Sequence, residues 1–208
     1  MSSLRSFLVV WLAFLAAWSV SPLPGFGEPA CRAVQQGKRL ELCSPFFVFR
    51  LDTAAGLRAE SWENRLTGRK ISLGGGPELE FDIGLPDRPL QTPRLEVSRV
   101  EVKGQGEAGE VVLQLTAKEP AASATVTYRW DAKQPVLRKF VTLTNNSSQP
   151  WSRLLNVRLG SHQTKAKVAD KEQGFPLYVN DEFFMSLAHP AGWATGKGGQ
   201  LSLRQHPE

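Results

Sequence analysis

The side chains best able to transfer a proton gather near the C-terminal end of the sequence. His189, one of three histidines, follows Asp181 by eight residues and Glu182 by seven. A histidine beside a carboxylate can serve as general base and general acid when a third group orients the ring. No orienting group stands out, so a structural turn before Pro190 is the favoured interpretation of His189, and the sequence assigns no catalytic residue.

Aromatic rings are the second kind of side chain that indicates ligand binding. A ring can stack on the apolar face of a sugar while nearby carboxylates and amides bind its hydroxyl groups. Trp193, in a glycine-rich segment, is the first candidate because loops often carry binding residues, and Trp62, beside Glu63 and Asn64, is the second. For each ring, packing is the competing explanation, and Trp130, which alternates with apolar residues, is expected in the core. The predicted carbohydrate-binding residues are Trp193, His189, Asp181, Glu182 and Trp62.

The two cysteines, Cys31 and Cys43, leave two arrangements open. In an oxidising compartment they can form a disulfide, which would stabilise the fold by about 3 kcal/mol in the chain-entropy model. Otherwise they are two unpaired thiols. They form no CxxC pair and have no histidine nearby, so no metal site is predicted. The nucleophile elbow, the zinc-binding helix motif and the dinucleotide-binding fingerprint are absent from the sequence, and no cofactor is predicted.

The first 27 residues have the layout of a secretory signal peptide. Arg5 precedes an uncharged apolar run of 14 residues from Phe7 to Val20, and Pro22 and Gly25 then interrupt any helix. The run is short for a transmembrane helix, which needs about 20 residues, although an uncleaved anchor helix is the alternative. We therefore predict a secreted or periplasmic protein with a signal peptide over residues 1–27, one folded domain over residues 28–208, and no membrane association after cleavage.

The net charge of +5 is modest and is spread along the chain. The densest basic cluster consists of Lys165, Lys167 and Lys171, and Asp170 and Glu172 interrupt it. Nucleic-acid binding usually requires a basic stripe together with an element that reads the bases. The sequence contains neither, so no nucleic-acid partner is predicted.

Period-two alternation of apolar and polar residues dominates after residue 40. Residues 79–85, 111–117, 124–130 and 155–159 each follow it, and each therefore predicts a strand with one buried face. Phe46 to Leu51 is apolar almost throughout, which is typical of a strand covered on both faces. The alternation within residues 95–102 breaks step between Val97 and Val100, where a β-bulge would restore the phase.

Turn-forming segments separate these runs at the spacing of antiparallel strands. Turns or loops are expected at residues 54–56, 64–68, 103–109 and 145–150, and a flexible break is expected at Gly74-Gly75-Gly76-Pro77. No segment after the N-terminal leader shows a sustained helical period. We therefore predict an all-β fold in which roughly nine or ten antiparallel strands form a β-sandwich.

The order of several short motifs resembles that in a known family. It is similar to the N-terminal β-supersandwich domains, of the galactose-mutarotase-like superfamily, that precede the barrel in α-galactosidase-like glycoside hydrolases. The segments that carry this resemblance are Phe49-Arg50-Leu51-Asp52, Gly56-Leu57-Arg58, Trp62-Glu63-Asn64-Arg65-Leu66-Thr67-Gly68, Glu78-Leu79-Glu80-Phe81, Tyr128-Arg129-Trp130, Pro135-Val136-Leu137-Arg138-Lys139, Leu143-Thr144-Asn145, and the run from Asp181 to Pro190. The resemblance covers about residues 45–205.

The resemblance implies an accessory role more than a catalytic one. The acidic residue expected before His-Pro is replaced by Ala188, and the barrel with its paired carboxylates is absent from the sequence, although glycoside hydrolysis needs two carboxyl groups. The expected function is an exported, non-catalytic domain that binds carbohydrate or packs against a glycoside hydrolase catalytic domain. Its abrupt C-terminal end favours a fragment or the first module of a longer protein, with a sandwich that is incomplete at this end. The alternatives are a stand-alone sugar epimerase and a structural cell-surface sandwich, the latter weakened by missing Cys…Trp…Cys spacing.

Overall fold

The computed structural model describes residues 31–86, 88–169, 176–187, 192–195 and 200–205. In these ranges all regular secondary structure is β-strand, which confirms the all-β prediction, and every strand pairing is antiparallel. The strands are β1 (Arg32–Gln36), β2 (Arg39–Cys43), β3 (Phe47–Asp52), β4 (Arg58–Asn64), β5 (Arg69–Pro77), β6 (Glu80–Gly84), β7 (Glu96–Gly104), β8 (Ala108–Ala117), β9 (Ala122–Asp131), β10 (Leu137–Asn145), β11 (Arg153–Gln163), β12 (Val168–Ala169), β13 (Leu177–Val179), β14 (Phe183–Met185), β15 (Gly192–Thr195) and β16 (Gln200–Gln205).

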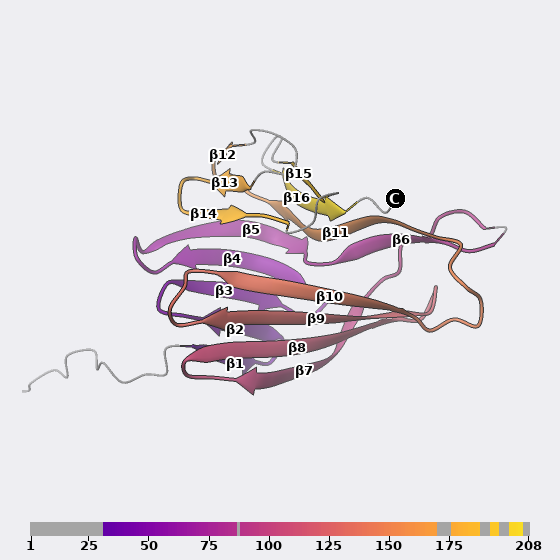
Figure 1. Ribbon diagram of the computed structural model, residues 1–208, viewed down its shortest axis with the longest axis horizontal. Helices are drawn as coiled ribbons and strands as arrows, with labels where there is room; N and C mark the ends of the chain where they lie inside the picture. The colour runs from indigo at the N-terminus through magenta and orange to yellow at the C-terminus, as the bar shows by residue number, and fades with distance from the viewer. Residues whose placement is uncertain (1–30, 87, 170–175, 188–191, 196–199, 206–208) are drawn as a thin grey trace, which may run out of the picture.

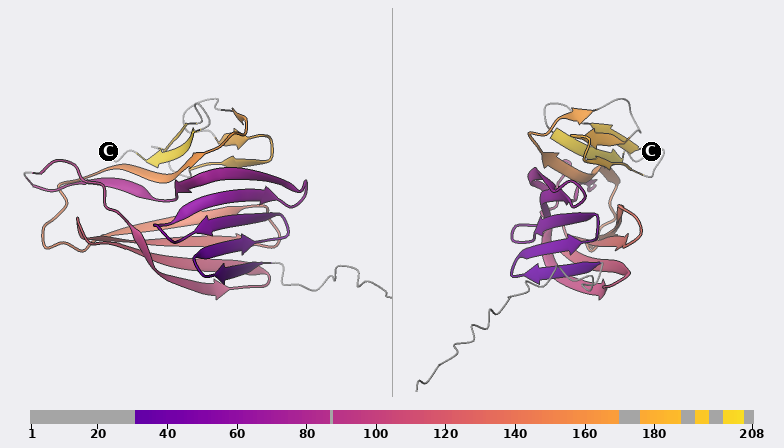
Figure 2. Two further views of the ribbon diagram at one scale, coloured as in Figure 1. Left: turned by 180° about the vertical axis from the view of Figure 1, so that it is seen from behind. Right: turned by 90° about the vertical axis from the view of Figure 1, so that its left-hand side faces the viewer.

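Two facing sheets form the main body of the sandwich (Figures 1 and 2). One has the strand order β1-β2-β3-β4-β5, and the other has the order β10-β9-β8-β7. A third sheet, β15-β16-β11-β6, lies beside β5, and a small sheet, β12-β13-β14, completes the arrangement. The structure is therefore an antiparallel β-sandwich with additional sheets beside β5.

The alternation read from the sequence places the core between the two main sheets. In β9 the side chains of Ala122, Ala124, Val126, Tyr128 and Trp130 are all buried, whereas the intervening residues face outward. Because successive side chains of a strand point to opposite faces, this single strand supplies a continuous apolar surface. The buried Trp130 confirms its predicted place in the core, and its indole N–H donates a 2.8 Å hydrogen bond to the Cys43 carbonyl oxygen of the opposite sheet.

The predicted irregularity in β7 is confirmed. The register of β7 against β8 shifts between Val97 and Arg99, at the point where the sequence breaks its alternation. A bulge inserts one residue into one strand of a pair, and the apolar side chains on either side then return to the same face. The expected turns at residues 54–56, 64–68 and 103–109 likewise lie between consecutive strands.

The glycine-rich segment expected to be a flexible break is instead part of strand β5, so that prediction is wrong. The reason is a close approach between β5 and β11. A Cβ atom at Gly76 would lie 1.9 Å from the Ser161 carbonyl oxygen and 2.7 Å from the His162 Cα. Only glycine permits this contact, and Gly74 and Gly75 have φ values of +66° and +64°, which glycine adopts without strain.

The sequence also missed several short strands. The structure contains sixteen strands in its described ranges, more than the nine or ten expected, because β1 was not recognised and β12, β13 and β14 are only two or three residues long. Cys31 and Cys43 are both buried free thiols, which is the second of the two arrangements left open. The predicted signal peptide lies outside the described residues. Among those that are described, no helix has the length and apolar character needed to cross a membrane.

Candidate functional site

The five predicted carbohydrate-binding residues do not all lie in the described part of the structure. Glu182 and Asp181 lie in the turn of the β13–β14 hairpin, and Trp62 lies on the adjacent strand β4. The backbone of Trp193 lies in β15, whereas its side chain and all of His189 lie outside what the structure describes. The described part of the predicted site is therefore the β13–β14 hairpin with its contacts to β4 and the β4–β5 turn.

The β13–β14 hairpin has a buried face and an exposed face. Leu177 and Val179 are 1% and 0% exposed, whereas Tyr178 between them is 42% exposed. In β14, Phe183 packs against the core while Phe184 is 55% exposed. Alternation therefore sends one aromatic ring of each strand outward, and the register pairs Tyr178 directly with Phe184.

The turn of this hairpin explains the presence of Asp181. Asn180 and Asp181 have φ values of +52° and +57°, and the Glu182 N–H donates a 3.0 Å hydrogen bond to the Val179 carbonyl oxygen. Asparagine and aspartate tolerate the left-handed region better than other non-glycine residues, so the two residues suit this turn. The Asp181 side chain is exposed at the tip.

Glu182 fastens the hairpin to the turn between β4 and β5. Its Oε2 accepts hydrogen bonds from Thr67 Oγ1 at 2.6 Å and Asn64 Nδ2 at 3.1 Å, and its Oε1 lies 2.7 Å from Arg69 Nη1. The hydrogen bond from Thr67 and the interactions with Arg69 lower the pKa of the Glu182 carboxyl group. Because both carboxylate oxygens are engaged within the chain, this residue positions the hairpin and is not a free ligand-binding group.

Trp62 packs against the buried face of the β13–β14 hairpin. Its ring stacks on Phe183 with centroids 5.3 Å apart and on Phe47 with centroids 4.6 Å apart. The indole is therefore held between β3 and β14, where it continues the core under the exposed rings. These contacts of Trp62 are packing contacts, which is the explanation that the sequence left open beside sugar binding.

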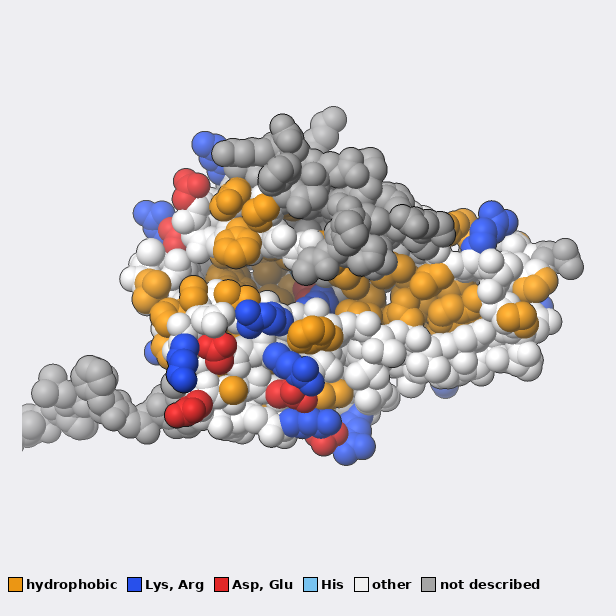
Figure 3. Space-filling view, in the orientation of Figure 1, with side chains coloured by type: hydrophobic (Ala, Val, Ile, Leu, Met, Phe, Trp, Pro, Cys, Tyr) orange, Lys and Arg blue, Asp and Glu red, His pale blue; other side chains and the backbone are white. Residues whose placement is uncertain are grey.

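The exposed rings of Tyr178 and Phe184 form the surface that sequence reasoning missed. Their centroids lie 6.3 Å apart at an interplanar angle of 50°. Hydrophobic side chains are visible over this hairpin at the upper left of Figure 3. A period-two count along residues 177–179 and 183–185 would have separated these outward rings from the inward Val179 and Phe183.

A second group of polar side chains, also missed, lies buried where the sheets meet. We call Glu78, Tyr128, Lys139 and His162 the Glu78 cluster; Glu78, Tyr128 and His162 are 3%, 1% and 1% exposed. Lys139 Nζ lies 2.6 Å from Glu78 Oε2 and 2.9 Å from the Leu159 carbonyl oxygen. The Tyr128 hydroxyl donates a short hydrogen bond to Glu78 Oε2, and His162 Nε2 lies 3.4 Å from Glu78 Oε1.

Burial and charge shift the pKa values of the Glu78 cluster in different directions. Burial opposes ionisation of Glu78, but the Lys139 ammonium and hydrogen bonds from Lys139 and Tyr128 outweigh it, so the pKa of Glu78 is lowered. Burial, followed by the Glu78 charge, raises the pKa of Tyr128 well above its ordinary value. Burial lowers the pKa of His162 despite the nearby carboxylate. The result is a buried Glu⁻–Lys⁺ pair beside a neutral histidine.

The sequence feature that could have revealed this cluster is a charged residue, Lys139, at an inward-facing position of a strand. Lys139 shares its phase in β10 with Leu137, Val141 and Leu143, which pack against the core. Glu78 Oε1 and His162 Nδ1 have no hydrogen-bond partner in the described structure. In the described structure these buried groups bond to one another, and the cluster forms a polar joint between the sheets.

No metal centre can be assembled from the residues that are described, since they contain no group of three or more suitable side chains. Comparison of the sequence with protein-family models gives no match, and comparison with curated proteins gives no significant match. The resemblance to the N-terminal domains of α-galactosidase-like enzymes thus depends on the motif order alone.

Proposed function

We propose that this chain is an exported, non-catalytic β-sandwich domain that binds carbohydrate through the β13–β14 hairpin. The observation that supports this proposal most directly is the pair of exposed rings, Tyr178 and Phe184, on a hairpin fastened by Glu182. We further propose, from the motif order, that the domain is related to the N-terminal domains of α-galactosidase-like glycoside hydrolases and works beside a catalytic domain.

The chemistry of the hairpin suits a neutral sugar. Aromatic rings bind the C–H face of a pyranose, and a carboxylate nearby accepts hydrogen bonds from its hydroxyl groups. Tyr178 provides a ring and a hydroxyl group, Phe184 provides a second ring, and Asp181 presents an exposed carboxylate at the same turn. Anchoring by Glu182 limits the entropy that ligand binding would remove from the hairpin.

A glycan array followed by calorimetry on residues 28–208 tests this proposal. We expect binding to a neutral galactoside-containing glycan, and Tyr178→Ala or Phe184→Ala to weaken it by about 5- to 150-fold, which corresponds to 1–3 kcal/mol for an aromatic contact. Phe140→Ala is the matched control, because Phe140 is also an aromatic residue, 49% exposed, but lies on β10.

Two outcomes would contradict the proposal. One is the absence of glycan binding by a protein whose circular dichroism shows a folded β-structure. The other is equal loss of affinity in the Phe140→Ala and Phe184→Ala variants. A mutarotation assay on the same sample separates the enzymatic alternative, since acceleration that His189→Ala abolishes would indicate an epimerase.

A further inference from the structure

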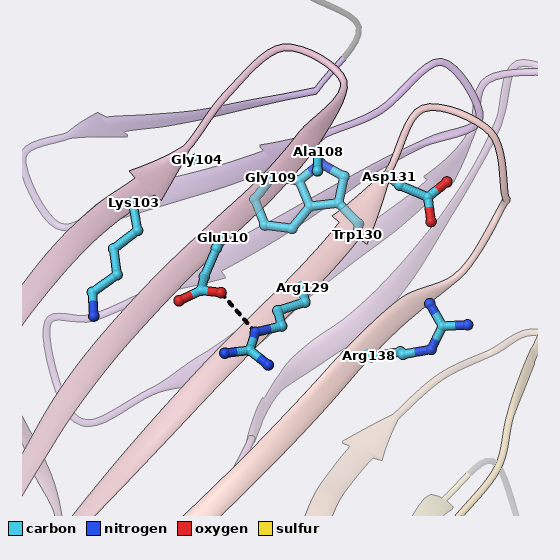
Figure 4. A pocket seen from close by; sticks show the side chains of 9 residues that line it. All are labelled: Lys103, Gly104, Ala108, Gly109, Glu110, Arg129, Trp130, Asp131 and Arg138. Atoms are coloured by element: carbon cyan, nitrogen blue, oxygen red, sulfur yellow. Dashed lines mark hydrogen bonds and ion pairs between the residues drawn. The ribbon is translucent and has the colours of Figure 1, made fainter.

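A concave surface, separate from the β13–β14 hairpin, lies on the outer face of the β10-β9-β8-β7 sheet. It is a depression of about 460 Å³ to which all four strands contribute. Figure 4 shows Lys103 on β7, Glu110 on β8, Arg129 on β9 and Arg138 on β10 around it. With Asp131, five charged side chains line the depression, three cationic and two acidic, and no function described so far uses them.

Two of the cations oppose each other across neighbouring strands. Arg129 of β9 pairs in register with Arg138 of β10. Like charges at directly opposite positions destabilise a sheet, because their Cβ atoms are only about 5 Å apart. In Figure 4 the two guanidinium groups turn away from each other, which separates the like charges. An anion bound by either group would further offset the repulsion.

The guanidinium group of Arg129 is already oriented. Its Nε donates a 2.6 Å hydrogen bond to Glu110 Oε2, and the group lies over the Phe140 ring, 5.3 Å from the centroid. These contacts occupy one edge and one face of the guanidinium group and leave its remaining N–H groups for a ligand. The only partner that the described residues give Arg138 is the neutral Gln134 amide, at 3.3 Å.

From this arrangement we propose that the depression binds a small acidic saccharide through its carboxylate or sulfate group. A planar guanidinium group matches such an oxyanion with a pair of parallel hydrogen bonds. Lys103 adds a third positive charge at the opposite side of the depression. Glu110 contributes carboxylate oxygens that can accept hydrogen bonds from sugar hydroxyl groups. The mixed lining therefore suits a hydroxyl-rich acid better than a bare inorganic anion.

This inference is independent of the proposed hairpin site. The ligand there is a neutral glycan bound by exposed rings, whereas here the charge of the ligand is recognised by Arg129 and Arg138. Loss of one site by mutation should leave the other intact, so the two proposals can fail separately.

Calorimetric titration of the folded protein with glucuronate, glucose 6-sulfate and glucose tests the inference. All titrations are made at one ionic strength fixed with sodium chloride, because screening alone weakens exposed charge interactions. We expect at least one of the two acids to bind about tenfold or more tightly than glucose, and Arg138→Gln and Arg129→Gln each to remove about tenfold of that affinity. Arg99→Gln on β7 is the matched control, because Arg99 is a 69% exposed arginine of the same sheet outside the depression.

The inference is overturned if neither acid binds more tightly than glucose, or if Arg99→Gln lowers the affinity as much as Arg138→Gln. A second measurement keeps the test meaningful if a variant is altered in folding. Because Arg138→Gln removes a like-charge contact, its midpoint of urea unfolding without ligand should equal or exceed that of the wild type. A lower midpoint would show that Arg138 supports the fold and would also count against the inference.

Discussion

At the scale of single residues, the Glu78 cluster forms a buried polar contact between two sheets. Lys139 is 16% exposed at its side chain and bonds Glu78 from β10, whereas Arg129 forms a similarly short pair with Glu110 at 57% exposure. The chemistry of the two pairs is alike, and burial is what distinguishes them. A buried charge that loses its partner remains uncompensated, while an exposed charge is solvated by water.

Replacing Lys139 with methionine should therefore destabilise the protein strongly. We expect Lys139→Met to lower the free energy of unfolding by about 3–5 kcal/mol, since Glu78 would be left buried without its cation. The control, Arg129→Met, should cost no more than about 1 kcal/mol. Urea denaturation at pH 7 measures both values, and equal losses would show that burial of the Glu78 cluster is not important for stability.

The same cluster predicts how stability depends on pH. His162 has a pKa below its ordinary value of 6.5 in the folded protein, so the unfolded chain binds its proton more readily. Stability from this residue is fully present above pH 6.5 and decreases as the pH falls through that value towards the folded pKa. The slope cannot exceed about 1.4 kcal/mol per pH unit for one group. The lowered pKa of Glu78 adds a further loss only below about pH 4.5.

Urea denaturation between pH 8 and pH 5 measures this slope. We expect His162→Gln to flatten the curve in this interval, because glutamine does not titrate. The variant should retain its loss of stability below about pH 4.5, where the unfolded chain protonates Glu78 more readily than the folded protein does. A wild-type curve that is already flat from pH 8 to pH 5 would disprove the role of His162.

At the scale of elements, glycine controls how closely β5 approaches β11. Adding a methyl group at Gly76 would force it into the Ser161 carbonyl oxygen, whereas a Cβ at neighbouring Gly75 meets nothing within 4 Å. We expect Gly76→Ala to cost more than about 3 kcal/mol of stability through overpacking. Gly75→Ala should cost only about 1–2 kcal/mol, from its positive φ. Chemical denaturation of the two variants compares these values, and a similar cost for both would exclude the steric explanation.

The second element-scale prediction concerns the anchoring of the β13–β14 hairpin. Glu182→Ala removes the hydrogen bonds to Thr67 and Asn64 and the ion pair to Arg69. We expect the amide hydrogens of β13 and β14 to exchange faster in this variant, while those of β8 and β9 keep their protection. Hydrogen–deuterium exchange followed by mass spectrometry measures this difference. Glu60→Ala, which removes only a 3.7 Å ion pair to Arg39, is the control and should leave the hairpin unchanged.

At the scale of the whole molecule, the sequence predicts the sandwich better than it predicts the contacts between sheets. Alternation is a local property of one strand, and it correctly placed β6, β8, β9 and β11 and the bulge in β7, while a continuous apolar run placed β3. The clash that requires glycine at position 76 involves a residue 85 positions away, Ser161, so no local pattern reveals it. The contact between Glu78 and His162 also joins residues far apart in the sequence, so no local pattern reveals it either. At the candidate site, Asp181, Glu182 and Trp62 were predicted. The exposed partners Tyr178 and Phe184 were not, because no strand was predicted over residues 177–185 and no outward face was therefore assigned.

These long-range contacts predict that the sandwich unfolds as one unit. The Glu78 cluster links β9 and β10 of one sheet to β11 of another, and one apolar core includes residues from each of the four sheets, counting the partly buried Val168, Phe183, Met185, Leu154 and Leu159. Trp62, Trp130 and Trp151 report on different parts of this core. We expect their fluorescence and the far-ultraviolet circular dichroism signal to change at the same urea concentration in a single transition. Lys139→Met should shift both curves together, because the joint stabilises the whole body. Two separated transitions, in the wild type or in this variant, would show instead that the sheets unfold independently and that the buried polar joint does not couple them.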